Sequence, residues 1–136
     1  MADLDGRTFL VTGANTGIGK ATARALAARG ATVTLACRSQ ENGRRTIEEI
    51  AVQTGNRRLE LLALDLGDLG SVRACAEAFL ALDEPLHVLI NNAGLAGRRG
   101  MTSSGFEIAF GTNYVGPFLL TSLLLDRLRA SAPPGS

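Results

Sequence analysis

The chain has 136 residues, of which 46% are hydrophobic and 20% are charged, so one globular domain with its own core is expected. Its 14 Lys and Arg residues nearly balance 13 Asp and Glu residues. The resulting formal net charge of +1 excludes attraction of nucleic acid or of an anionic membrane by charge alone. No apolar run approaches the roughly 20 residues that a membrane-spanning helix needs, and no secretory leader follows Met1. We therefore expect a cytoplasmic protein whose partners must be identified from its sites.

Metal and disulfide chemistry have little support in the sequence. Cys37 and Cys75 are too few for a disulfide framework, and with the single histidine, His87, they make a four-ligand zinc site implausible. We expect two small buried cysteine side chains and a structural histidine. Glu48 and Glu49 are adjacent on a predicted helix and so face different ways, and we interpret them as solvated surface.

Apolar, β-branched runs alternate with longer segments of helical period, which is the pattern of βαβ units around a parallel sheet. The first strand is predicted over residues 8–12. A glycine-containing segment follows over 13–19, and an alanine-rich helix then runs to about Arg29, with Gly30 as its stop.

The second βα unit has clear signals at both ends of its helix. Its strand is predicted over residues 32–37 and its helix over 40–53. Ser39 is a natural N-cap, and Gly55 is the expected stop.

A third strand is predicted over residues 59–64 and ends at Asp65. Beyond it, apolar residues recur at helical spacing and predict a helix with one face on the sheet. The residues of this face are Val72, Cys75, Ala76, Phe79 and Leu82.

The fourth strand is predicted over residues 87–90, and a polar loop separates it from a long helix over 106–128. Pro117 removes a backbone donor and clashes with the preceding turn, so a bend is expected there. We assign residues 1–129 to one domain and residues 130–136 to a flexible tail.

Three glycines stand between the first predicted strand and its helix, in the segment Thr12-Gly13-Ala14-Asn15-Thr16-Gly17-Ile18-Gly19. Gly13 permits a sharp turn, and Gly17 lets the backbone approach a pyrophosphate. Gly19 lets the helix begin close to the sheet, where free N–H groups and the helix dipole favour anions. A Walker A loop is disfavoured because Ala14 and Ala21 stand where it needs Gly and Ser or Thr. A purely structural turn is the other alternative.

The G-x-x-x-G-x-G spacing resembles the TGxxxGxG cofactor motif of the short-chain dehydrogenase/reductase superfamily. Three later features agree with that family in order and spacing: Asp65, the segment Asn91-Asn92-Ala93-Gly94, and Asn113. The resemblance extends over residues 8–128 and implies a Rossmann-type doubly wound parallel sheet, truncated at its C-terminal side. Within the superfamily, similarity to the retinol dehydrogenase-like branch rests on residues 13–20, 36–38, 105–107 and 118–121.

The resemblance implies a binding site for a nicotinamide dinucleotide. Asp65 would lie at the adenine ring, and the Asn-Asn-Ala-Gly segment would steady the sheet and lie along the cofactor. Asn113 would hold a water of the proton relay and is the one implied catalytic position. The implied cofactor-binding residues are Gly13, Asn15, Thr16, Gly17, Ile18, Gly19, Arg38, Asp65, Leu66, Asn92, Ala93 and Gly94.

The end of the second strand bears on the choice of cofactor. An acidic residue there would hydrogen-bond the ribose and repel a 2′-phosphate, but Cys37 and Arg38 occupy the position. A guanidinium can hold a phosphate through two charge-assisted hydrogen bonds, so NADP(H) is expected over NAD(H). The alternative is a solvated Arg38 that pairs with Glu41. Lys20, in the first turn of the first helix, is left without a role.

Catalysis in this family requires a Tyr that transfers a proton, a Lys four positions later that lowers the pKa of that Tyr, and a Ser that polarises the carbonyl. The one tyrosine, Tyr114, is followed four positions later by Phe118, so we interpret Tyr114 as a packing residue. In the family these groups lie beyond the helix that holds Asn113, and this chain ends 23 residues after Asn113. Neither Ser122 nor Ser131 receives a catalytic role.

We therefore expect a fragment, inactive alone, of an NADP-dependent oxidoreductase that interconverts an alcohol and a carbonyl compound, with a retinoid or another lipophilic molecule as a candidate substrate. The alternatives are a non-catalytic nucleotide-binding product that pairs with a full-length relative, and a folding remnant. The long helix packs between subunits in this family. Phe110, Phe118 and Leu119 are thus candidates for a homo-oligomer contact, with core packing as the alternative.

Overall fold

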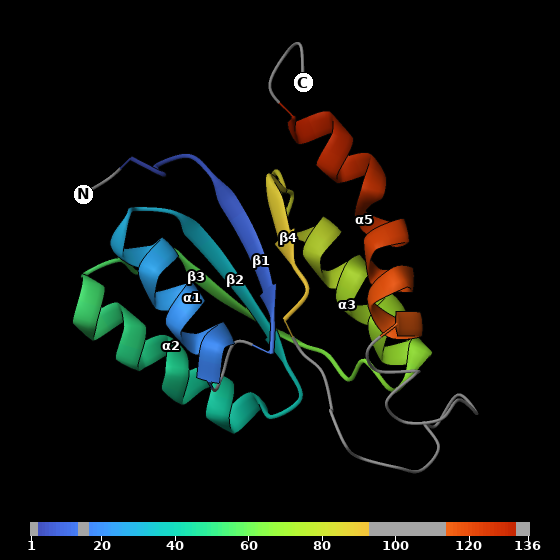
Figure 1. The fold of residues 1–136 in the computed structure, drawn as a ribbon, viewed down its shortest axis with the longest axis horizontal. Helices are drawn as coiled ribbons and strands as arrows, with labels where there is room; N and C mark the ends of the chain where they lie inside the picture. The colour runs from blue at the N-terminus through green and yellow to red at the C-terminus, as the bar shows by residue number, and fades with distance from the viewer. Residues whose placement is uncertain (1–2, 14–16, 93–113, 133–136) are drawn as a thin grey trace.

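The structure of the chain, a computed structural model, describes residues 3–13, 17–92 and 114–132. Its sheet consists of β1 (Thr8–Thr12), β2 (Thr32–Cys37), β3 (Leu59–Ala63) and β4 (Val88–Ile90). All three strand pairs are parallel, and the spatial order is β3-β2-β1-β4 (Figure 1). The predictions for β1 and β2 are confirmed to the residue. β3 ends one residue earlier than predicted, and β4 begins one residue later.

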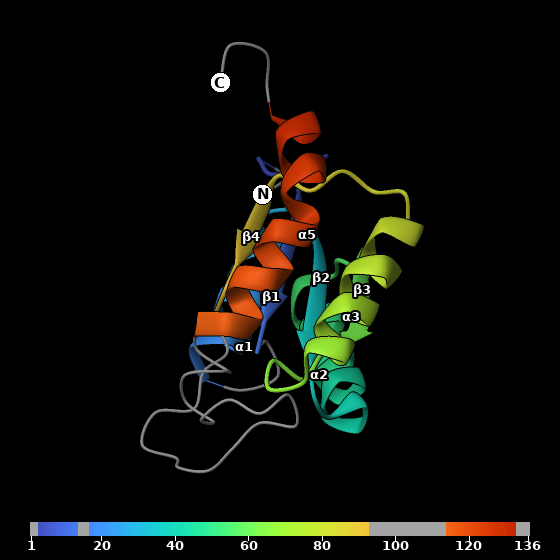
Figure 2. The same ribbon diagram turned by 90° about the vertical axis from the view of Figure 1, so that its right-hand side faces the viewer.

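Two pairs of helices cover the sheet: α1 (Gly17–Ala28), α2 (Gln40–Thr54), α3 (Leu69–Ala81) and α5 (Gly116–Ser131). The pair α1 and α2 lies on one face, and the pair α3 and α5 lies on the other (Figures 1 and 2). This arrangement confirms the predicted doubly wound α/β fold. Among the helices in the described ranges, none has the length and apolar character that crossing a bilayer requires.

Side chains of the central strand β1 alternate between two hydrophobic cores. Phe9 and Val11 pack with α1 and α2, whereas Leu10 packs with α3 and α5. Because helices cover both faces, the central strands are continuous apolar runs. Four of the five residues of the predicted α3 face are buried and the fifth is partly buried against the same core, which confirms that face: Val72, Cys75, Ala76, Phe79 and Leu82.

The ends of the helices follow local capping rules. The Ser39 hydroxyl accepts a hydrogen bond from the Asn42 N–H at 3.1 Å, and Gly55 ends α2 with a φ of 75°. Both caps were predicted from the sequence. Asp68 caps α3 in the same way, accepting from the Gly70 N–H at 2.9 Å, although no sequence prediction named it.

The C-terminal helix continues past its predicted end, and the start of its prediction lies outside the described residues. The described α-helix α5 begins at Gly116, and the two residues before it, Tyr114 and Val115, are π-helical, so Pro117 follows a turn of chain that is already helical. The predicted helical residues 106–113 lie outside the described residues, so the expected bend at Pro117 stays a prediction. At the other end α5 continues to Ser131, whose hydroxyl accepts from the Leu86 N–H at 2.9 Å. Residues 130 and 131 of the predicted tail are thus helical.

A buried asparagine joins two connections at the amino-terminal edge of the sheet. The Asn56 side-chain amide donates to the carbonyls of Ala27 at 3.0 Å and Ala31 at 2.7 Å. Its side-chain oxygen accepts from the Arg58 N–H at 2.8 Å. The segment between α2 and β3 is thereby tied to the segment between α1 and β2.

Thr34, in the middle of β2, has a buried hydroxyl without a hydrogen-bond partner in the described part of the chain. A Thr34→Val variant keeps the shape of the side chain and removes this unsatisfied group, so we expect the free energy of unfolding to rise by about 1 kcal/mol. Urea denaturation measures the change.

The matched control for Thr34 is Thr54→Val, because the Thr54 hydroxyl donates to the Ile50 carbonyl at 2.7 Å and accepts from the Asn56 N–H at 3.1 Å. This control is expected to lower the stability. Opposite signs for the two substitutions support the explanation, and a destabilised Thr34→Val chain contradicts it.

Candidate functional site

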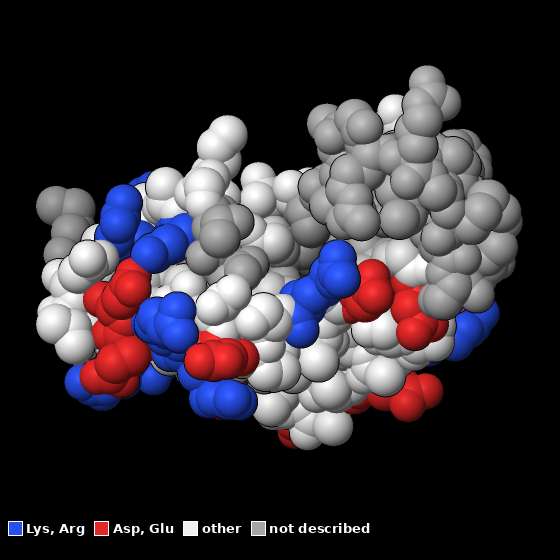
Figure 3. All heavy atoms as spheres, turned by 90° about the horizontal axis from the view of Figure 1, so that it is seen from below, with Lys and Arg blue, Asp and Glu red and all other residues white. Residues whose placement is uncertain are grey.

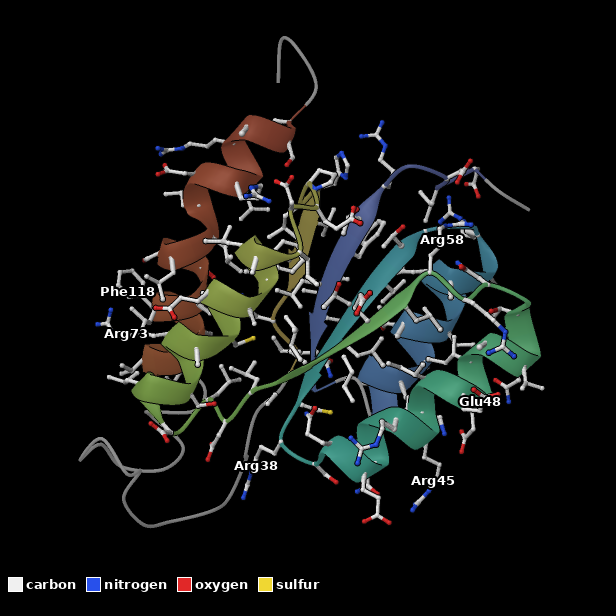
Figure 4. All side chains as sticks on the ribbon, turned by 180° about the vertical axis from the view of Figure 1, so that it is seen from behind. Arg38, Arg45, Glu48, Arg58, Arg73 and Phe118 are labelled. Carbon is white, nitrogen blue, oxygen red and sulfur yellow. The ribbon has the colours of Figure 1, made fainter. Side chains whose placement is uncertain are left out.

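The carboxyl ends of the four parallel strands lie at one edge of the sheet. At this edge the order in which strands are added switches from one side of β1 to the other. From β1 the chain proceeds to β2 and β3 on one side, and it then crosses to β4 on the other side of β1. In open α/β sheets such a switch point leaves a crevice in which ligands bind. Gly13 follows β1, Arg38 follows β2, and Asn91 and Asn92 follow β4 at this edge. Figure 4 shows Arg38 there, with Arg58 at the opposite edge.

The described glycines at the two ends of the glycine loop have a backbone conformation that favours glycine. Gly13 and Gly17 have φ values of 62° and 58°, a left-handed region that strains residues with a side chain. The Gly13 N–H donates to the Ala36 carbonyl at 2.9 Å, which holds the loop to the end of β2. A Cβ added to Gly17 would meet no described atom within 4 Å, so its positive φ, rather than crowding, favours glycine at this position.

Gly19 permits the close approach of α1 to the end of β1. A Cβ at this position would lie 2.3 Å from the Gly13 carbonyl oxygen and 2.5 Å from Nδ2 of Asn92. The first contact is with backbone, which cannot rotate away as a side chain can. Glycine is thus required here for packing, and the free N–H groups of α1 are brought to the edge of the sheet.

The turn after β4 is bonded directly to the turn after β1. The Asn92 N–H donates to Oγ1 of Thr12 at 2.9 Å, and the Asn92 side-chain amide reaches the Gly13 carbonyl at 3.5 Å. Asn91 instead donates through its side chain to Oγ1 of Thr121 on α5, at 3.2 Å. The parts played by Thr12 and Thr121 were not predicted, because a hydroxyl on a strand or helix carries no local sign of its distant partner.

At the end of β2, Arg38 is exposed at the edge that carries the glycine loop (Figure 4). The alternative partner considered for it, Glu41, pairs with Arg45 at 3.4 Å instead. Within residues 3–13, 17–92 and 114–132, no ion pair involves Arg38. Gln40 fixes the turn by donating from its side chain to the Cys37 carbonyl at 3.3 Å. The Arg38 side chain therefore lies exposed at the edge with no described carboxylate to neutralise it.

The segment after β3 presents a polar turn and a buried side chain. The Asp65 carboxylate accepts from the Gly67 N–H at 3.0 Å, and the Asp65 N–H donates to the Ser71 hydroxyl at 2.9 Å. Leu66 is 4% exposed and belongs to the core under α3 and α5. Only the backbone of Leu66 is therefore available to a ligand, whereas Asp65 is half-buried at the edge.

Five of the predicted site residues lie outside the described residues: Asn15, Thr16, Ala93, Gly94 and Asn113. Their roles stay predictions. Gly13, Arg38 and Asn92 follow three neighbouring strands, and Gly17 and Gly19 lie in the first turn of α1. Ile18 is 78% exposed in the first turn of α1, a position open to a ligand.

Lys20 and the two adjacent glutamates form ion pairs rather than a catalytic group. Lys20 pairs with Glu49 across α1 and α2, and this contact lowers the pKa of the Glu49 carboxyl. Glu48 pairs with Arg57 at 3.5 Å. The two glutamates thus have different partners, and Figure 3, which shows the edge from below, shows basic and acidic groups intermixed over the described part of that surface.

The remaining reactive side chains have structural roles. Nδ1 of His87 accepts from the Thr8 N–H at 2.9 Å, as expected of a structural histidine. Both cysteines are free and buried, and burial raises the pKa of Cys37 and raises that of Cys75 to about 11, so the thiols stay protonated at neutral pH. Tyr114 is 66% exposed, so its interpretation as a packing residue is wrong.

The strand order, the two helix layers and the glycine loop at the switch point define a Rossmann-type α/β protein. The chain belongs to the short-chain dehydrogenase family: the family model described as "short chain dehydrogenase" matches residues 7–136. The resemblance inferred from the glycine spacing and the Asn-Asn-Ala-Gly segment is therefore confirmed.

Two curated relatives support the predicted branch. Human Retinol dehydrogenase 11 is 53% identical over 131 residues, which cover 96% of this chain and 41% of the relative. Bovine Dehydrogenase/reductase SDR family member 13 is 51% identical over 133 residues, covering 98% of this chain and 35% of that protein. The chain thus spans less than half the length of these relatives.

Solved structures share the fold. A Mycobacterium paratuberculosis protein is 45% identical with a TM-score of 0.76, over 93% of this chain and 45% of its own. The Pseudomonas aeruginosa RhlG/NADP active-site complex is 32% identical with a TM-score of 0.82, over 96% and 51%. A metagenomic short-chain oxidoreductase in complex with NADP is 34% identical with a TM-score of 0.79, over 93% and 58%.

Proposed function

We propose that this chain forms the NADP(H)-binding part of an oxidoreductase that interconverts an alcohol and a carbonyl compound, with a lipophilic substrate such as a retinoid. The observation that carries the proposal is the placement of the glycine loop and the exposed Arg38 at one edge of the sheet. Family membership supports the reaction class, and the name of Retinol dehydrogenase 11 supports the substrate class.

The described residues fit a dinucleotide in two ways. Gly19 lets the N-terminus of α1 approach the sheet, and a Cβ added to Gly17 would meet no described atom within 4 Å, so a diphosphate can lie against free backbone N–H groups. The half-buried Asp65 and the exposed Ile18 border the same edge, where the adenosine and diphosphate portions would lie.

The preference for NADP(H) rests on the end of β2. Cys37 and Arg38 stand where a ribose-binding carboxylate would repel a 2′-phosphate, and Arg38 is free of described acidic partners. Its guanidinium can bind a phosphate with charge-assisted hydrogen bonds. Two of the structures reported above are named as NADP complexes, which favours the same choice.

The bound cofactor supplies the hydride chemistry, and the residues of this chain bind and orient it. Phe118 stands four positions after Tyr114, where the family has a lysine, so we assign proton transfer to no described residue. Asn113 stays a predicted relay position. We therefore assign cofactor binding to this chain and the redox reaction to the whole protein.

Replacing Arg38 with glutamate tests the proposal. Losing the phosphate contact and adding a carboxylate at the ribose should weaken NADPH binding by about 10-fold or more, while NADH binding stays the same or improves. Calorimetric titration of each variant with both cofactors measures the two dissociation constants.

Arg73→Glu is the matched control, because Arg73 is an exposed arginine of α3 that lies away from Arg38 (Figure 4). It changes the net charge by the same amount and should leave both dissociation constants unchanged. An Arg38→Glu chain with the wild-type cofactor preference contradicts the assignment of NADP(H). A folded wild-type chain that binds neither cofactor contradicts the proposed function itself.

A further inference from the structure

A hydrogen bond joins the end of β4 to α5 beside the proposed cofactor site. The Asn91 side-chain amide donates to Oγ1 of Thr121 at 3.2 Å. Thr121 is half-buried on the helix, whereas Asn91 is exposed at the edge of the sheet. The bond connects two elements that are 30 residues apart in the sequence.

The bonds of the next residue continue from this point to the glycine loop. The Asn92 N–H donates to Oγ1 of Thr12 at 2.9 Å, and the Asn92 side chain approaches the Gly13 carbonyl at 3.5 Å. That carbonyl lies against Gly19, where not even a Cβ fits. Because the packing there is close, a shift of the turn after β4 would be transmitted to the loop.

We propose that Thr121 is a positioning residue for the cofactor site. Its hydroxyl holds Asn91, which sets the position of Asn92 and, through Thr12 and Gly13, the shape of the glycine loop. This inference rests on the proposed function. It assigns to α5 a part in cofactor binding without requiring any contact between the helix and the cofactor.

Two substitutions at Thr121 separate the hydrogen bond from packing. Thr121→Val keeps the shape and a methyl group but removes the hydroxyl, whereas Thr121→Ser keeps the hydroxyl and removes the methyl group. Ser122→Ala is the matched control, because Ser122 is the adjacent exposed hydroxyl of the same helix.

Calorimetric titration of the full chain with NADPH provides the first measurement. Thr121→Val is expected to bind NADPH about 3- to 10-fold more weakly than the wild type, the range for loss of one hydrogen bond. Thr121→Ser and Ser122→Ala are expected to stay within about 2-fold of the wild type on the same scale. If the wild type binds NADPH and Thr121→Val binds it equally well, the inference is overturned. The inference is also overturned if Thr121→Ser binds NADPH as weakly as Thr121→Val does.

Amide hydrogen exchange without cofactor provides the second measurement. The Asn92 N–H is expected to exchange about 3- to 10-fold faster in Thr121→Val and at the wild-type rate in Ser122→Ala. If the folded wild type binds no NADPH, the proposed function fails, and the Asn92 exchange rate alone decides whether Thr121 holds the turn. An unchanged rate in Thr121→Val then overturns the positioning role.

Discussion

An alanine at position 19 is expected to weaken NADPH binding about 100-fold and to lower the free energy of unfolding by about 2–3 kcal/mol. The added Cβ would lie 2.3 Å from the Gly13 carbonyl oxygen, so α1 must move away from the end of β1. The glycine loop runs between these two elements. The same movement therefore displaces the N–H groups that we propose bind the diphosphate. Calorimetric titration and urea denaturation measure the two effects.

Gly70→Ala provides the matched control for Gly19→Ala. Gly70 is also in the first turn of a helix, but its added Cβ would meet only Oδ1 of Asp68 at 3.3 Å, a side chain that can shift. Its stability should change by no more than about 1 kcal/mol, since alanine is the better helix former, and NADPH binding should be unchanged. A Gly19→Ala chain that binds NADPH as tightly as the wild type would show that close packing of α1 is not needed for the site.

Local signals account for most of the element boundaries. β1 and β2 were predicted to the residue because both strands are buried on two faces and read as continuous apolar runs. Ser39 and Gly55 bound α2 for equally local reasons, since the cap requires a hydroxyl and the stop requires a positive φ. Pro117 shows the limit of such signals, because a proline either bends a helix interior or fits a first turn, and the choice depends on where the helix around it begins.

In the candidate site, local sequence patterns predict the glycine positions but not the long-range contacts. The glycines were predictable because their spacing and their place between a strand and a helix both matter for the chemistry. The ion-pair partner of Glu41 was not predictable in the same way, because Arg38 and Arg45 are both close to Glu41 in the sequence. The helical i,i+4 spacing places Arg45 beside Glu41. The bond from Asn92 to Thr12 spans 80 residues, and no pattern within a strand or helix specifies such a pair.

Lys20 illustrates the same limit at the start of α1. From the sequence it was a basic residue in a first helical turn with no assigned role. The structure gives it a partner on the neighbouring helix, Glu49, at a separation of 29 residues. Its ammonium group is thereby tied to α2, so Arg38 is the basic side chain on which we base the choice of cofactor.

Replacing Asn56 with alanine is expected to lower the free energy of unfolding by about 2–4 kcal/mol, although Asn56 lies at the edge of the sheet opposite the site. Asn56 is 9% exposed and bonds three backbone groups: the carbonyls of Ala27 and Ala31 and the N–H of Arg58. The Ala27 carbonyl also accepts from the Gly30 N–H, so it keeps a partner. The Ala31 carbonyl loses a buried hydrogen bond and the Arg58 N–H a part-buried one, which accounts for the size of the effect.

Asn56→Asp tests the direction of these bonds. An aspartate keeps the oxygen that accepts from Arg58, but it places a carboxylate oxygen against the carbonyls of Ala27 and Ala31, where an amide donor stood. Near neutral pH this variant should be at least as unstable as Asn56→Ala. Its stability should improve as the pH falls toward the range in which the carboxyl is protonated, because a protonated carboxyl can donate to one carbonyl again.

Asn42→Ala is the control for the loss of an asparagine, since Asn42 is exposed on α2 and its side-chain oxygen is 3.4 Å from Nη1 of Arg45. It should change the stability by no more than about 0.5 kcal/mol. Equal effects of Asn56→Ala and Asn42→Ala in urea denaturation would contradict the assignment of Asn56 as the link between the two connections. A large loss for Asn56 alone would show that one buried amide ties the α2–β3 connection to the α1–β2 connection, in addition to the apolar packing between this helix layer and the sheet.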